Sequence, residues 1–164
     1  MTPTQTAQHT IIRQRLTELG LELPAPSSAV ASYVPAVRTG NYLYTSGQLP
    51  LVDGALPHTG KVAADVSAED AAELARICTL NAFAAISALV DLDSIIRVVK
   101  VVGFVASAPG FNGQPAVVNG ASDLLLAVFG DKGQHARSAV GVADLPLNAP
   151  VEVELIVELD EQET

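Results

Sequence analysis

The sequence predicts an α+β domain in which two helices lie on one face of a mixed β-sheet. The order of the expected elements is the main reason. After an N-terminal helix they run strand, strand, helix, strand, helix, strand and strand, a pattern typical of a sheet layered with helices. The last strand adds a second reason, because residues 151–159 carry apolar side chains at odd positions and mostly glutamates at even ones. One face of that strand is therefore core and the other is more polar.

Composition limits the classes of protein to which the chain can belong. The 164 residues are 49% hydrophobic and suit one compact domain. A net charge of -9 opposes binding to nucleic acid, whose phosphates need clustered cations. The longest apolar stretches are interrupted by Arg97 and Lys100 and are too short to span a bilayer, and residues 1–10 lack the apolar core of a signal peptide. We expect a soluble cytoplasmic protein with no membrane or nucleic-acid partner.

The N-terminal part predicts one helix and a linker. Apolar residues recur at helical spacing over residues 4–20, and Gly20 is placed to end that helix. Residues 23–28 contain two prolines that a helix cannot continue through. We expect residues 1–28 to form a helical extension and linker, and residues 29–164 to form a single domain.

The next expected elements are a β-hairpin and a long helix. Residues 37–38 and 42–46 flank the turn formers Gly40 and Asn41, as in a hairpin. Ser67, followed three residues later by an aspartate, resembles a helix cap. The helix that begins there is expected to run to about residue 90.

That helix carries a long apolar face suited to packing on a sheet. Cys78 lies on this face and is expected to pack as a small hydrophobic residue rather than to react.

The second half supplies the remaining elements. Residues 95–106 are rich in valine and isoleucine and predict a central strand, and residues 116–129 predict the second helix. The loop between them, 107–114, suits either a flexible lid or a surface excursion. Strands are expected over 138–142 and 151–159. A sheet face that is neither covered nor fully polar commonly meets copies of itself, so we expect a homo-oligomer.

Two residues near the C-terminus stand out as candidates for a small-molecule site. Arg137 precedes an apolar strand, and its guanidinium can hold a carboxylate through two hydrogen bonds. Glu152 can handle a proton or position a water molecule. Two plainer interpretations stay open: Arg137 could pair with an acidic neighbour, and Glu152 could be a solvated strand residue. The histidines lack metal-ligand spacing, and His135 is the one that lies near Arg137.

Several short motifs, taken in order, resemble the Rid proteins, the reactive intermediate deaminases also called YjgF-like and formerly L-PSP endoribonucleases. The resemblance spans residues 33–158 and rests on Tyr33, the run Tyr44-Thr45-Ser46-Gly47-Gln48-Leu49-Pro50, the Arg137-Ser138 pair, and Leu145-Pro146 followed by Val151-Glu152-Val153-Glu154. It implies a chorismate-mutase-like fold and a homotrimer whose sheets line a central β-barrel. Three clefts would then lie at the subunit boundaries.

The resemblance also implies roles for individual residues. The arginine that matches Arg137 grips a substrate carboxylate, and the glutamate that matches Glu152 activates or places the attacking water. Tyr33 and the Ser46-Gly47 segment would wall the cleft from the neighbouring subunit. Asn119 matches a helical asparagine near the site. No metal or organic cofactor is implied.

One departure from the family bears on function. Many members carry a cysteine two residues after the arginine, where this chain has Ala139. Ala139 is expected to line the substrate site, and no thiol at this position can be essential here. The implied activity is hydrolysis of enamine or imine intermediates of the 2-aminoacrylate type to 2-oxo acids and ammonia. The alternative is a non-catalytic trimer that binds a small carboxylate or serves a regulatory role, and a ribonuclease is disfavoured by the negative charge.

Overall fold

The structure, a computed structural model, describes residues 11–26 and 32–161 and confirms the α+β class. Its helices are α1 (Ile11–Glu18), α2 (Ala68–Ser87) and α3 (Gln114–Phe129), and its strands are β1 (Ala36–Thr39), β2 (Tyr42–Thr45), β3 (Ile95–Ala106), β4 (Ala136–Val142) and β5 (Val151–Leu159). The strands form one sheet in the order β1-β2-β5-β3-β4. Among the described strands only β3 and β4 pair in parallel, so the sheet is mixed.

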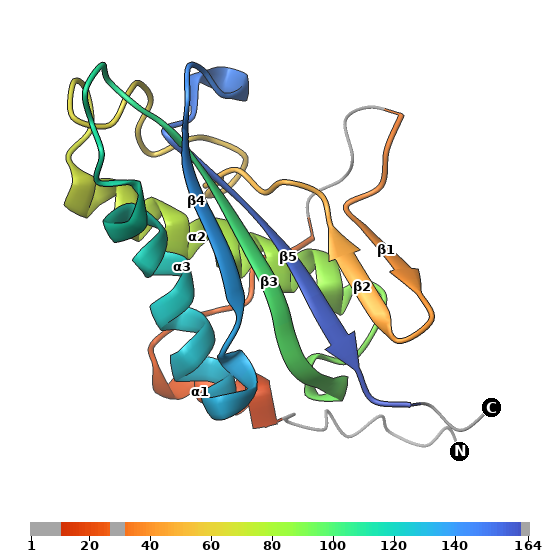
Figure 1. Ribbon diagram of the computed structural model, residues 1–164. Coiled ribbons are helices and arrows are strands. Elements are labelled where there is room, and N and C mark those ends of the chain that lie inside the picture. The colour runs from red at the N-terminus through yellow and green to blue at the C-terminus, as the bar shows by residue number, and fades with distance from the viewer. Residues whose placement is uncertain (1–10, 27–31, 162–164) are drawn as a thin grey trace.

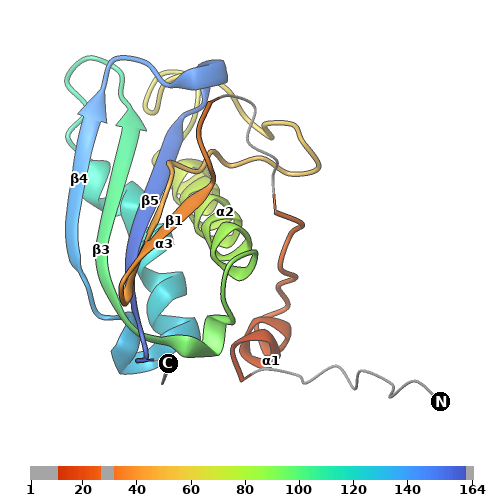
Figure 2. The same cartoon turned by 90° about the vertical axis from the view of Figure 1, so that its right-hand side faces the viewer.

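Helices α2 and α3 lie on the same side of the sheet (Figure 1), as the sequence predicted. Seen from the side (Figure 2), they form one layer and the strands form the other. The alternation in β5 is confirmed, because its odd-numbered residues are buried and its even-numbered ones are half-buried. We call the side toward α2 and α3 the covered face and the other side, over which no described element packs, the open face.

Local chemistry explains where α2 begins and ends. The Ser67 side chain accepts a 3.0 Å hydrogen bond from the backbone N–H of Asp70, which confirms the expected cap. The helix stops at Ser87, slightly before the predicted end near residue 90. There the N–H groups of Leu89 and Val90 both bond to the Ile86 carbonyl and close the last turn.

Two elements begin two residues earlier than the sequence predicted. Helix α3 starts at Gln114 rather than 116, since Pro115 occupies its first turn, where a proline needs no hydrogen-bond partner for its nitrogen. Strand β4 starts at Ala136 rather than 138, because Ala136 and Arg137 pair with Lys100 and Val101 of β3. Arg137 therefore lies inside the strand and not ahead of it.

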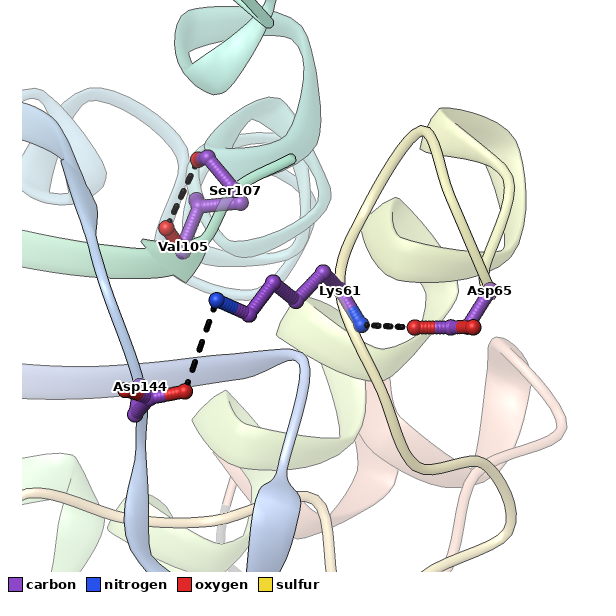
Figure 3. A network of polar contacts seen from close by, with 5 residues as sticks. All are labelled: Lys61, Asp65, Val105, Ser107 and Asp144. Carbon is purple, nitrogen blue, oxygen red and sulfur yellow. Dashed lines mark hydrogen bonds and ion pairs between the residues drawn. The ribbon is translucent and has the colours of Figure 1, made fainter. Parts of the chain in front are cut away.

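One end of the sheet is held together by loops. The Val62 N–H donates to the Ala106 carbonyl at the end of β3, and the Gly60 N–H donates to the Asn148 carbonyl, both at 2.8 Å. Figure 3 shows Lys61 between two carboxylates: its backbone N–H donates to Asp65, and its ammonium lies 3.5 Å from Asp144 Oδ1. The long connection between β2 and α2 is thereby joined to both β3 and the β4–β5 loop.

Helix α1 packs on the body of the domain. The Asp93 carboxylate accepts from the N–H groups of Ile11 and Ile12 at 2.8 and 2.9 Å, and Arg15 donates to the Val128 carbonyl. Leu16 is buried in the common core. The part of the expected helix before residue 11 lies outside the described residues. In the ranges 11–26 and 32–161, no helix has the length and apolar character needed to cross a membrane.

Candidate active site

Arg137 belongs to the covered face of the sheet. It pairs with Val101, which in turn pairs with Leu155, and both partners are buried under the helices. Paired residues of adjacent strands direct their side chains to the same face. Because β4 is an edge strand, Arg137 sits at the rim of the covered face, where it reaches α3.

Helix α3 holds the Arg137 guanidinium in place. Nη1 donates to Asn119 Oδ1 at 2.8 Å and to Ser122 Oγ at 3.1 Å, and Nη2 donates to the Pro115 carbonyl at 3.4 Å. A guanidinium has five N–H donors. Within residues 11–26 and 32–161 the Nε–H and one Nη2–H have no partner, so two donors remain for a ligand. Arg137 makes no ion pair with an acidic residue of this described part of the chain, which removes the plainer interpretation of its role there.

Glu152 belongs to the open face. It pairs with Phe104 and occupies an even position of β5, opposite in direction to buried Val151 and Val153. Its carboxylate lies directly over Gly47, since a Cβ atom added to that glycine would overlap Glu152 Oε1. The absence of a side chain at Gly47 therefore makes the space that the carboxylate occupies.

The pKa of Glu152 is raised above the usual carboxyl value. Partial burial is the larger cause, because it disfavours the charged form, and the like charge of Glu154 on the same face adds to it. A raised pKa makes a carboxylate a better proton acceptor than an ordinary one.

Ser46 precedes Gly47 in the chain and bonds to the segment that follows Tyr33. Ser46 Oγ donates to the Val34 carbonyl at 2.7 Å, and the Ser46 N–H donates to the Pro35 carbonyl, so the segment after Tyr33 is tied to the end of β2. Tyr33 itself is 54% exposed.

The residues predicted for the site fall into two groups. Around the rim of the covered face lie Arg137, Asn119 and half-buried Ala139, whose strand partner Gly103 packs against α3. Along the open face and the adjoining loop lie Glu152, Gly47, Ser46 and Tyr33. The sheet separates the two groups, so one chain alone does not bring Arg137 and Glu152 together.

Two further possibilities from the sequence were a reactive Cys78 and a metal site. Cys78 is fully buried, as expected for a packing residue, and its Sγ lies 3.7 Å from the Val151 carbonyl. Burial raises the pKa of its thiol well above the usual value, with the nearby Glu152 charge as a smaller cause. Among the residues that the structure describes, no group of three or more side chains could hold a metal ion.

Sequence reasoning missed Ser122, noted His135 only for its position, and named Gln48 only as part of a motif. Ser122 contacts Arg137, and His135 contacts Ser122. Ser122 is three residues after Asn119 and so shares its helix face, a spacing that could have identified it. The Gln48 side chain is buried and donates to the Ser46 carbonyl, while its backbone pairs with Val153 of β5.

Comparison with known proteins places these features in a wider group. Residues 13–159 match the family model described as "YjgF/chorismate_mutase-like, putative endoribonuclease". Protein TCP17 of Trypanosoma cruzi is 45% identical over 151 residues, 91% of this chain and 94% of the relative. The 2-iminobutanoate/2-iminopropanoate deaminase of Escherichia coli K12 is 32% identical, with 79% and 88% coverage. A solved structure of Atu1372 from Agrobacterium tumefaciens, a protein of unknown function, has a TM-score of 0.85 and 48% identity over 92% of this chain and 94% of that one.

Proposed function

Because this chain belongs to the YjgF/chorismate mutase-like family, we propose that it hydrolyses reactive imines of small 2-amino acids to 2-oxo acids and ammonia. An E. coli relative is named for the deamination of 2-iminobutanoate and 2-iminopropanoate. Each of those molecules carries a carboxylate beside a C=N bond. A site for them needs a cation for the carboxylate and a group that directs water to the carbon.

The observation that carries this proposal is the hydrogen bonding of the Arg137 guanidinium. Its guanidinium is held at three points by α3 and keeps two N–H donors for a ligand. A planar guanidinium with two available donors is suited to a carboxylate, which accepts through both of its oxygens. Small Ala139, two residues along the same face of β4, leaves room beside it.

The reaction asks for little beyond positioning and one proton carrier. Water adds to the iminium carbon and loses a proton, the carbinolamine collapses, and the C–N bond breaks to release ammonia. Glu152 accepts the proton of the attacking water as a carboxylate and returns it to the departing nitrogen. Its raised pKa fits it for both steps. The overall balance is one iminium and one water to one 2-oxo acid and one ammonium ion.

Our proposal further requires more than one chain, and we propose a homotrimer whose sheets enclose a central barrel. The sheet separates Arg137 from Glu152 within one chain, so a second copy has to supply the other half of each cleft. The open face is suited to burial between copies, because it carries large apolar side chains that are 41–52% exposed: Val37, Tyr42, Tyr44 and Val140. Exposed apolar patches of this kind mark protein–protein contacts.

The direct test measures hydrolysis of 2-iminopropionate generated in situ. The wild-type protein should release pyruvate and ammonia faster than buffer alone, and Arg137→Ala should lose at least about a hundredfold in kcat/KM, as expected when a paired charge is removed. Arg137→Lys should recover little, because an ammonium cannot hold a carboxylate through a planar fork. Arg38→Ala is the matched control, since Arg38 is exposed and its Nε donates to the Gly40 carbonyl of its own turn.

A second candidate function is a trimer that captures a small carboxylate without catalysis. It is favoured by Ala139, because the resemblance to the Rid proteins implies a cysteine at this position in many members. Calorimetry with pyruvate separates the two. If pyruvate binds through Arg137 while the imine decays at the buffer rate, the protein is a binder and the deaminase proposal fails. RNA cleavage by purified wild-type protein, lost in Arg137→Ala, would contradict both.

A further inference from the structure

The Arg137 guanidinium is the first member of a longer chain of hydrogen bonds. Its Nη1 donates to Ser122 Oγ at 3.1 Å, and the same hydroxyl lies 2.9 Å from His135 Nε2. The other ring nitrogen, His135 Nδ1, lies 2.6 Å from the Gly133 carbonyl. Ser122 is buried and His135 is half-buried, so this chain runs beneath the rim of the sheet.

The direction of each hydrogen bond follows from the chemistry of its ends. A carbonyl oxygen only accepts, so His135 Nδ1 carries a hydrogen and donates it to Gly133. In the neutral ring Nε2 is then an acceptor, and the Ser122 hydroxyl donates to it. With its hydrogen committed, Ser122 presents a lone pair to Arg137.

We propose that Ser122 and His135 are positioning residues that fix the Arg137 guanidinium for carboxylate binding. Without the imidazole acceptor, the Ser122 hydroxyl is free to rotate and to direct its hydrogen at Nη1, which would repel it. With the acceptor, only one orientation of the hydroxyl satisfies all three groups. Nη1 is then held by two acceptors, Asn119 and Ser122, and Nε and Nη2 keep a constant direction.

This inference deepens the proposed function and rests on Arg137 being the carboxylate anchor. It assigns roles to two residues that do not touch the substrate. Since both act through Arg137, their loss should weaken the grip on the carboxylate more than it slows the chemical step. The expected signature is a raised KM or Kd with little change in kcat.

The experiment uses the whole 164-residue chain and pairs each disruptive variant with one that restores the hydrogen bond. Ser122→Ala and His135→Phe remove a hydroxyl and a ring acceptor. Each should raise KM for 2-iminopropionate and Kd for pyruvate about tenfold, as expected for one hydrogen bond to a charged group. Ser122→Thr restores a hydroxyl and His135→Gln restores an acceptor, and both should recover most of the affinity. Gln134→Ala, at an exposed neighbour, should behave as wild type.

The results distinguish this inference from the function on which it rests. If Ser122→Ala and His135→Phe bind pyruvate as wild type does while Arg137→Ala does not, the positioning role is wrong and the anchor stands. A fall in Tm with no change in KM or Kd, or no recovery in the threonine and glutamine variants, also overturns it. If Arg137→Ala itself binds pyruvate normally, the proposed function is wrong. The Kd for pyruvate tests the positioning role of Ser122 and His135 even if the protein binds pyruvate without catalysing hydrolysis.

Discussion

The two faces of the sheet in this protein differ in what packs on them. The covered face is closed within the chain, since α2 and α3 bury the odd-numbered side chains of β5 and the whole of Cys78. The open face keeps half-buried glutamates beside exposed tyrosines, and no described element of the same chain packs on it. The first face accounts for why the chain folds. The second is where we expect the chain to meet its copies.

This contrast separates effects on folding from effects on function. A change on the covered face should lower the free energy of unfolding with little direct effect on chemistry. A change on the open face should leave the single chain folded and affect assembly or catalysis. Arg137 lies at the rim where the two meet, which is consistent with its being held by one face and used with the other.

The largest expected effect comes from placing a charge in the middle of the open face. Ile156 pairs with Tyr44 on one side and Lys100 on the other, so Ile156→Lys would crowd two ammonium groups at the proposed contact between copies. We expect complete loss of the proposed trimer and of the proposed imine hydrolysis with an unchanged circular dichroism spectrum. Light scattering after size exclusion measures the mass. Leu89→Lys, at a 53% exposed site away from the sheet, is the control. An active, assembled Ile156→Lys protein would show that this face is not the contact.

The next effect is on catalysis alone. Glu152→Gln should lower kcat about a hundredfold, as for loss of a proton-transfer group, whereas Glu158→Gln on the same strand and face should not. In the wild type, activity should fall as the pH drops through the raised pKa of Glu152, because the carboxylate is the acting form.

Glu152→Gln, which should lower activity, should maintain or raise the free energy of unfolding at neutral pH. The folded-state pKa of Glu152 lies above the unfolded value, so the charged carboxylate costs folding free energy once the pH rises past the ordinary carboxyl range. Glu152→Gln should therefore be at least as stable as wild type at pH 7, and the difference should vanish below about pH 4. A Gln variant less stable at neutral pH would contradict this assignment.

A smaller effect is expected where the two helices of the covered face meet. A Cβ atom at Gly120 would overlap the Ala72 carbonyl oxygen and lie 2.7 Å from its carbon, and both are backbone atoms that side-chain rotation cannot move. Alanine normally improves a helix by about 1 kcal/mol over glycine. Gly120→Ala should nevertheless cost about 2 kcal/mol through overpacking. Urea unfolding measures it, and a stabilised variant would show that α2 and α3 are free to separate.

The smallest effect is expected at Cys78. Its thiol is buried and its pKa is raised, so it should not react with a thiol reagent until the protein unfolds. Cys78→Ala should cost about 1 kcal/mol for the lost sulfur contacts and should hydrolyse imine at the wild-type rate. Rapid labelling of the folded protein would indicate that the covered face opens.

The sequence predicted those parts of the fold that short-range patterns determine. The bounds of β3 and β5 follow from their apolar content and alternation, and the start of α2 follows from the Ser67 cap. Motif resemblance, rather than periodicity, supplied most of the site residues. The positions of Arg137 and Glu152 on opposite faces could not be predicted, because they depend on the register of β4 against β3 and β5. That register is a long-range pairing, and a shift of one residue reverses every side chain.

The placement of Arg137 and Glu152 on opposite sides of one sheet has a consequence for how activity depends on protein concentration. If each reaction centre is shared between chains, a solitary chain has none, and specific activity should decline when the protein is diluted below the dissociation constant of the assembly. Newly synthesised chains would then be inactive until their concentration is high enough for assembly. The quantity of this protein, and not only its presence, would switch the chemistry on.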